Sequence, residues 1–181
     1  MAEAIKISME ELFDKRAPQQ MISEATAFKV VPKGLYRIKA TKYDATKNAE
    51  GRITVWFPVD ILNAEGARLA KGSLKVSPDA ARTVTGNLDT QAKLYGQLVK
   101  ALFPALTPEE QSQVSTAEVI QTFMQTPVDA FIAVQFKTAA KNPLTGWADW
   151  VNTNSPEEEV AARKAGHIPS NIIRSVQKAQ A

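Results

Sequence analysis

The sequence predicts a mainly β protein with added helices, of the α+β class, from three changes of pattern along the chain. Apolar residues alternate with other residues over 35–43, 52–61 and 68–76, recur at helical spacing between 89 and 125, and alternate again over 130–138 and 147–152. Three strands, a helical insert and two strands is the order of a five-stranded, OB-like Greek-key barrel. We expect this barrel over residues 28–152, after an N-terminal helix and linker (1–27) and before a C-terminal helical extension (153–181).

The apolar side of each strand and helix predicts the core of this barrel. A turn at 32–34 leads into the first strand, the connections at 44–51 and 63–66 separate the first three strands, and the loop 141–146 separates the last two. The residues expected in the core are Ile53, Val55, Phe57, Val59, Ile61, Leu98, Leu102, Ile132, Val134 and Phe136.

Helix start signals mark both ends of the chain and the insert. Ser8 can cap a short helix near the N-terminus, and Asp89 can cap the first helix of the insert, which continues in further helical pieces up to residue 125. Ser155 precedes a proline and three glutamates, a pattern typical of a helix start. A final short helix is expected after Ser170.

Composition and charge restrict the class of protein. The 181 residues are 44% hydrophobic and 23% charged, which is ordinary for a folded globular chain. No run of about 18 apolar residues and no secretory signal pattern occurs, so a cytoplasmic protein without membrane contact is expected. The net charge is +3, but residues 29–75 carry ten cations and four anions, whereas residues 1–28 carry three and five. The predicted strands could therefore attract a polyanion.

The most informative pattern is a sheet face that combines cations with aromatic rings. If the first two strands form a hairpin that pairs Tyr43 with Arg52, Lys39 comes opposite Trp56 on the face away from the core. The predicted nucleic-acid-binding residues of this face are Arg37, Lys39, Tyr43, Arg52, Trp56, Lys71 and Lys75. Cations suit phosphates, and rings suit the unstacked bases of a single strand. The alternative is that Trp56 covers an edge of the core and the cations are only solvated.

Further candidates lie in loops and in the last hairpin. The loop cations that could add to this face are Lys33, Lys42 and Lys47. Trp147 and Trp150 point to opposite faces if they lie on one strand, so at most one of them faces the core. The other is a second stacking platform or packs beneath the C-terminal helix.

The sequence offers no constellation for catalysis. Zero cysteines and a single histidine, His167, exclude thiolate sites and histidine-rich metal sites, and no serine elbow or nearby carboxylate makes that histidine a base. The glutamates at 109–110 and 157–159 stand in expected first helical turns, where the helix dipole accounts for them. No phosphate-cradling glycine loop occurs. We expect no enzyme activity, no metal and no cofactor.

Three segments resemble a known family. The segment Val31–Ile38 (VPKGLYRI), the strand end Phe57–Leu62 (FPVDIL) and a helix over 91–103 before the last strands resemble the OB-fold single-stranded-DNA-binding proteins that bacteriophages encode beside their replication and recombination genes. The resemblance covers residues 28–152. It implies a protein that coats single-stranded DNA in the host cytoplasm, with replication or recombination proteins as partners.

Three hypotheses of different classes follow from the sequence. The first is non-catalytic, largely sequence-independent binding of single-stranded DNA. The alternative is a viral structural or assembly protein that uses the same barrel and terminal helices to pack subunits. A third hypothesis is an accessory subunit that caps an enzyme. The sequence leaves open the choice between DNA and RNA, and also whether the protein forms a homo-oligomer.

Overall fold

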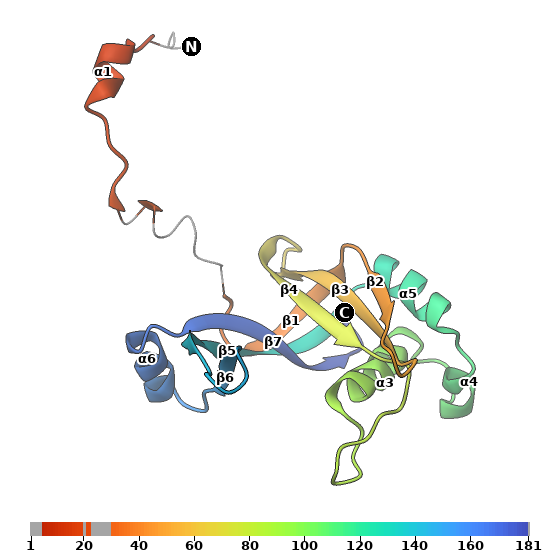
Figure 1. The fold of residues 1–181 in the computed structure, drawn as a ribbon. Coiled ribbons are helices and arrows are strands. Elements are labelled where there is room, and N and C mark those ends of the chain that lie inside the picture. Colours follow the sequence, from red (N-terminus) through yellow and green to blue (C-terminus); the bar gives the residue numbers. More distant parts are fainter. Residues whose placement is uncertain (1–4, 20, 23–29, 181) are drawn as a thin grey trace.

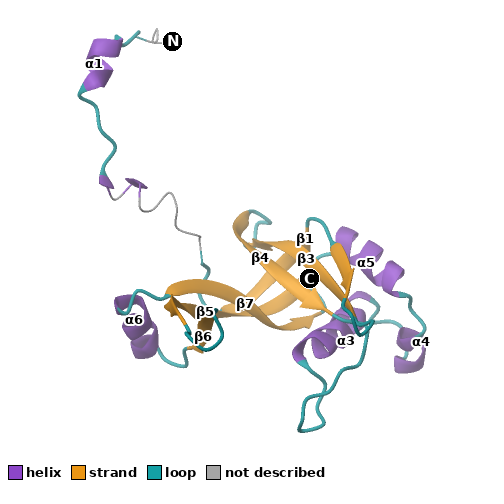
Figure 2. Ribbon diagram, viewed as in Figure 1, coloured by secondary structure: helices purple, strands orange, loops and turns teal. Residues whose placement is uncertain are grey.

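The fold is centred on a seven-stranded antiparallel sheet, seen in a computed structural model that describes residues 5–19, 21–22 and 30–180 (Figures 1 and 2). Its strands are β1 (Gly34–Ala40), β2 (Asp44–Lys47), β3 (Ile53–Leu62), β4 (Arg68–Val76), β5 (Val128–Lys141), β6 (Ala148–Asn152) and β7 (Ile168–Gln177). The helices are α1 (Met9–Phe13), α3 (Thr90–Leu102), α4 (Pro108–Ser112), α5 (Thr116–Gln125) and α6 (Pro156–Lys164). The expected mainly β fold with added helices is confirmed.

The long strands β3 and β5 organise the sheet. β1 pairs with both of them, β2 continues the β1 edge along β3, and β6 continues it along β5. β4 lies on the other edge of β3, and β7 lies on the other edge of β5. The Cα atoms of β4 and β7 approach within 8 Å of each other, yet no ladder joins these strands in the described part of the chain. The sheet is therefore open along this line.

The core forms on the side of the strands that the alternation predicts. Every second residue of β3 from Val55 to Ile61 is buried, and the ring of Phe57 meets the ring of Phe123 edge-on at 4.9 Å between centroids. α3 packs against β4 and β7, whereas α5 packs against β1. The predicted core residues are buried, except that Ile53 and Leu102 are half-buried and pack against the core. Val134 and Phe136 belong to a second, smaller cluster beneath α6.

The helix caps follow the sequence signals. The Oγ atom of Ser8 accepts a hydrogen bond from the backbone N–H of Glu11, and Asp89 and Ser155 cap α3 and α6 in the same way. α1 stands clear of the sheet, and its residues are exposed (Figure 1). Within the described residues, no helix is long and apolar enough to cross a membrane.

The predicted register of the first hairpin is wrong. Asp44, rather than Lys39, is the partner of Trp56, and Lys39 pairs with Asp60. The reason is a break at residues 41–43, which divides the expected first strand into β1 and β2. Lys39 and Asp44 lie opposite the outward residues Asp60 and Trp56 although they are five positions apart, so the alternation of faces shifts by one residue at this break. The mostly polar residues 41–47 carry no apolar pattern that would reveal the shift.

The final helix expected after Ser170 is also wrong, because this segment is strand β7. Its backbone pairs with β5 from Asp129 to Lys137, with one irregularity in the register. The β-branched residues Ile172, Ile173 and Val176 suit a strand, and two of them, Ile173 and Val176, are buried in the core. A long-range pairing therefore decides the structure of this segment.

Candidate nucleic-acid interface

Trp56 lies on the outer face of the sheet, in a row of side chains that crosses three strands. Its Cα partners are Asp44 on β2 and Lys75 on β4. The ammonium group of Lys42 lies 6.0 Å from the centroid of the Trp56 ring. The ring is half-buried, whereas both lysines are exposed. An aromatic surface thus lies between two cations.

A second row on the same face is rich in charge. Lys39, Asp60 and Lys71 follow one another across β1, β3 and β4. The Asp60 carboxylate lies 3.8 Å from the guanidinium of Arg68. Lys39 and Lys71, on either side of Asp60, are exposed. The structure therefore brings together Lys39, Trp56, Lys71 and Lys75, as members of one face, although their register differs from the prediction.

A groove runs between the open edges of β4 and β7, next to this face. It has two adjoining sections of about 490 and 500 Å³, which share the residues Ser73, Trp150, Ser170 and Asn171. The cationic side chains that line the two sections are Lys71, Lys75 and Lys137. The groove therefore combines positive charge, hydroxyl and amide groups and one aromatic ring.

Trp150 forms one wall of the groove and was not assigned to the site by sequence reasoning. It is 52% exposed, and the ammonium group of Lys137, its Cα partner on β5, lies 6.0 Å from its ring centroid. Trp147 is 77% exposed next to the turn between β5 and β6. Neither ring is buried beneath α6. The sequence signal was a pair of tryptophans close to Lys137, but only the fold shows which of the two meets β4.

Three of the predicted binding residues have other surroundings. Tyr43 is exposed in the break between β1 and β2. The Nε atom of Arg37 donates to the Asp129 carboxylate at 3.1 Å, and another nitrogen of its guanidinium donates to the backbone carbonyl of Gln180. Arg52 lies in a polar cluster at the start of β3. The face with its groove is therefore smaller than the sequence predicted, both near Arg37 and near Arg52.

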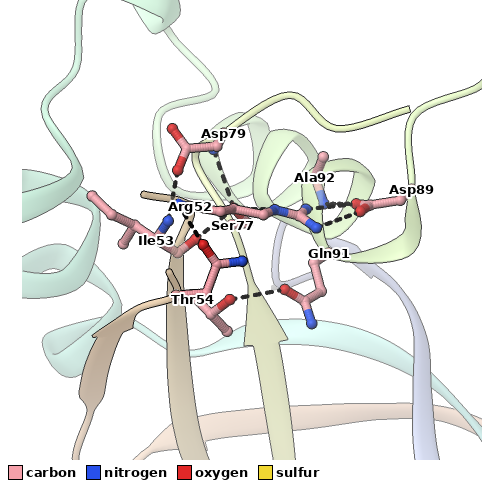
Figure 3. Close-up of polar contacts among 9 residues, drawn as sticks. Arg52, Ile53, Thr54, Ser77, Asp79, Asp89, Gln91 and Ala92 are labelled. Carbon is pink, nitrogen blue, oxygen red and sulfur yellow. Dashed lines mark hydrogen bonds and ion pairs between the residues drawn. The ribbon is translucent and has the colours of Figure 1, made fainter. Parts of the chain in front are cut away.

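The polar cluster fastens the start of β3 to the N-terminus of α3 (Figure 3). The Nη1 atom of Arg52 lies 2.6 Å from Oδ2 of Asp89, and its Nη2 atom donates to Oδ1 at 2.9 Å. Asp89 also caps α3 by accepting from the N–H of Ala92 at 3.0 Å, and Ser77 accepts from Nε of Arg52 at 3.2 Å. Thr54 and Gln91 connect the same two elements at 3.2 Å. We name this group the Arg52–Asp89 cluster.

Charge in the Arg52–Asp89 cluster changes the acidity of both partners. The hydrogen bond from Arg52, together with that from the backbone of Ala92, lowers the pKa of Asp89 below its ordinary value of 3.8. The hydrogen bond to Asp89 raises the pKa of Arg52. Both groups are therefore ionised at neutral pH, and the pair has a structural role that the sequence spacing does not indicate.

Replacing Asp89 with asparagine should lower the melting temperature near neutral pH, because Asn can still cap α3 but does not neutralise Arg52. A lowered pKa in the folded state gives stability that is present above the ordinary pKa and is lost as the pH falls through the folded value. The difference in melting temperature between wild type and Asp89→Asn should therefore shrink below a pH of about 4. Thermal unfolding followed by circular dichroism across this range measures it. Glu50→Gln in an exposed turn is the control, and a difference that is constant with pH would contradict the assignment.

The glutamate clusters lie in helix first turns, as expected. Glu109 and Glu110 begin α4, where Glu110 completes a capping box with Thr107, and residues 157–159 begin α6. No group of three or more His, Asp or Glu side chains suited to a metal ion occurs among the residues that the structure describes.

Comparison with known proteins does not identify a relative. The chain matches no model of a protein family, no curated protein and no solved structure closely enough to assign it. The functional argument therefore rests on the outer face and the groove themselves.

Proposed function

We propose that this protein binds single-stranded DNA, without catalysis and largely independently of base sequence, along β4 and the groove beside it. The observation that carries the proposal is that Lys71 and Lys75 lie on one strand, with Trp56 in the next strand on one side and Trp150 across the groove on the other. Binding of a single strand needs two components, cations for the phosphates and accessible aromatic rings on which bases stack, and this surface has both.

The lysines of β4 would contact the backbone of the strand. Lys71 and Lys75 point to the same side and, at about 3.3 Å per residue, lie roughly 13 Å apart, so they can reach separate phosphates. Bases on one side of this phosphate track would stack on Trp56, and bases that enter the groove would stack on Trp150. The hydroxyl group of Ser73 would supply a hydrogen bond that most bases can accept or donate, whereas the Asn171 side chain is already bonded to the backbone of Val31.

The strand order supports an OB-type arrangement for this binding surface. β1, β3 and β4 come first, the helical insert follows, and β5 and β7 complete a set of five strands. The strands at the two edges of this set, β4 and β7, approach each other. In this interpretation β7 takes the place expected for the strand over 147–152, while β6 and α6 elaborate the connection between the last two strands. OB folds bind single strands on the face and loops that correspond to β3, β4 and this connection.

The biological setting is part of the same proposal. The resemblance of residues 28–152 to phage single-stranded-DNA-binding proteins favours a role in phage DNA replication or recombination, in the cytoplasm of the host. The positive balance of residues 29–75 agrees with a polyanionic partner.

Single substitutions of the β4 lysines test the proposal. Lys71→Ala and Lys75→Ala should each weaken binding of a labelled oligo-dT and reduce the slope of log K against log salt by about 0.7, because each removes one phosphate contact on a single strand. Fluorescence anisotropy at several salt concentrations measures both quantities. Lys100→Ala, an exposed lysine near the end of α3, is the matched control. Slopes of the β4 variants that equal that of the control would exclude this path.

A further inference from the structure

The N-terminal segment exposes many apolar side chains. Seven large apolar residues between positions 5 and 22 are at least 48% exposed: Ile5, Ile7, Met9, Leu12, Phe13, Met21 and Ile22. Ser8 caps α1, and yet α1 stands clear of the sheet (Figure 1). Several apolar side chains gathered on one exposed segment usually mark a contact surface.

An apolar groove on the sheet offers a complementary surface. It has a volume of about 560 Å³ and lies where β1, β3 and β4 meet at one end. Leu35, Leu62 and Leu69 supply its apolar lining, with Leu35 47% and Leu69 37% exposed. This apolar groove is lined by different residues from the groove between β4 and β7.

We propose that α1 of one copy of this protein docks in the apolar groove of a second copy. Charge supports this choice of occupant, because α1 itself carries Glu10 and Glu11 and no cation, whereas residues 29–75 are strongly positive. Arg68, which directly precedes the lining residue Leu69, is exposed, and its guanidinium reaches Asp60 only at 3.8 Å, so it has donors to offer to an acidic helix. Arg37 and Asp129, which also line the groove, are already paired with each other.

The proposed contact is head to tail. α1 and the apolar groove are different surfaces of the same chain, so each copy can donate its helix to one neighbour and accept a helix from another. Association can then continue beyond two copies. This inference does not rest on the proposed binding of DNA, and it is tested without DNA.

Sedimentation velocity of the full chain over a range of concentrations tests the proposal. Wild type should associate as its concentration rises, because burying Leu12 and Phe13 in the groove removes apolar surface from water. The double substitution Leu12→Asp and Phe13→Asp should raise the concentration needed for association by at least tenfold. Leu69→Asp should do the same from the side of the groove, with Leu35→Asp as a second groove variant if Leu69→Asp lowers the melting temperature. Val84→Asp, at a fully exposed apolar position outside both surfaces, should leave association unchanged.

A mixing experiment separates the proposal from its competitors. The α1 variant keeps an intact groove, and the groove variant keeps an intact α1, so each alone should be monomeric while an equimolar mixture forms dimers and nothing larger. Wild type that stays monomeric at every concentration would overturn the proposal, and would favour docking of α1 on its own chain or on another protein. Association that neither substitution weakens, or a mixture that forms no dimer, would overturn it as well.

Discussion

Trp150→Ala is expected to weaken the binding of oligo-dT by about 1 to 3 kcal/mol, or roughly 5- to 150-fold, because it removes a stacking platform from the wall of the groove. Trp150 is 52% exposed, so its truncation should change the melting temperature little. Trp147→Ala removes the same side chain near the turn of the same hairpin, outside the lining of the groove, and should change affinity less than twofold. Fluorescence anisotropy and thermal unfolding on the same samples give both quantities.

Trp56 distinguishes the two interpretations of the outer face. If its ring stacks on a base, Trp56→Ala should also lose about 1 to 3 kcal/mol of binding. If the ring only covers the edge of the core, the same substitution should lower the melting temperature and leave affinity unchanged. Loss of stability without loss of affinity, in both the Trp56 and the Trp150 variants, would leave subunit packing as the better account of this face.

Phe57→Ala is expected to destabilise the protein by about 3 to 5 kcal/mol, because it opens a cavity in the centre of the core. Phe57 is fully buried on β3 and meets Phe123 of α5 at 4.9 Å, so it joins the sheet to the helical insert. Urea denaturation measures the loss, and Leu144→Ala at an exposed loop position should change stability by less than about 0.5 kcal/mol. A loss below about 1 kcal/mol for Phe57→Ala would show that the insert does not pack on β3 in this way.

Local periodicity predicted the parts of the fold in which one face of an element is buried. β3 is the clearest case, because Val55, Phe57, Val59 and Ile61 alternate with outward residues along the whole strand. β7 could not be predicted in this way. Ile172, Ile173 and Val176 fit the spacing of a helix as well as the composition of a strand, and the ladder with β5, some 40 residues earlier in the chain, decides between them.

The candidate site was predictable only in part, because contacts between residues far apart in the chain leave no local pattern. The outward positions of Lys39, Trp56 and Lys75 follow from alternation within single strands. The ion pair of Arg52 with Asp89 joins residues 37 positions apart and leaves no pattern in the local sequence. The groove combines β4 with β7, which are about a hundred residues apart in the chain, so Trp150 could be assigned to it only after β7 had been placed beside β4.

A titration of wild-type protein into labelled oligo-dT and into a labelled duplex of the same length, each at about 50 and 200 mM salt, tests the central claim most directly. The account predicts that oligo-dT binds more tightly than the duplex, since only unstacked bases can reach Trp56 and Trp150, and that the higher salt concentration weakens this binding. Absence of binding to oligo-dT at the lower salt concentration, or equal binding of the duplex, would contradict it.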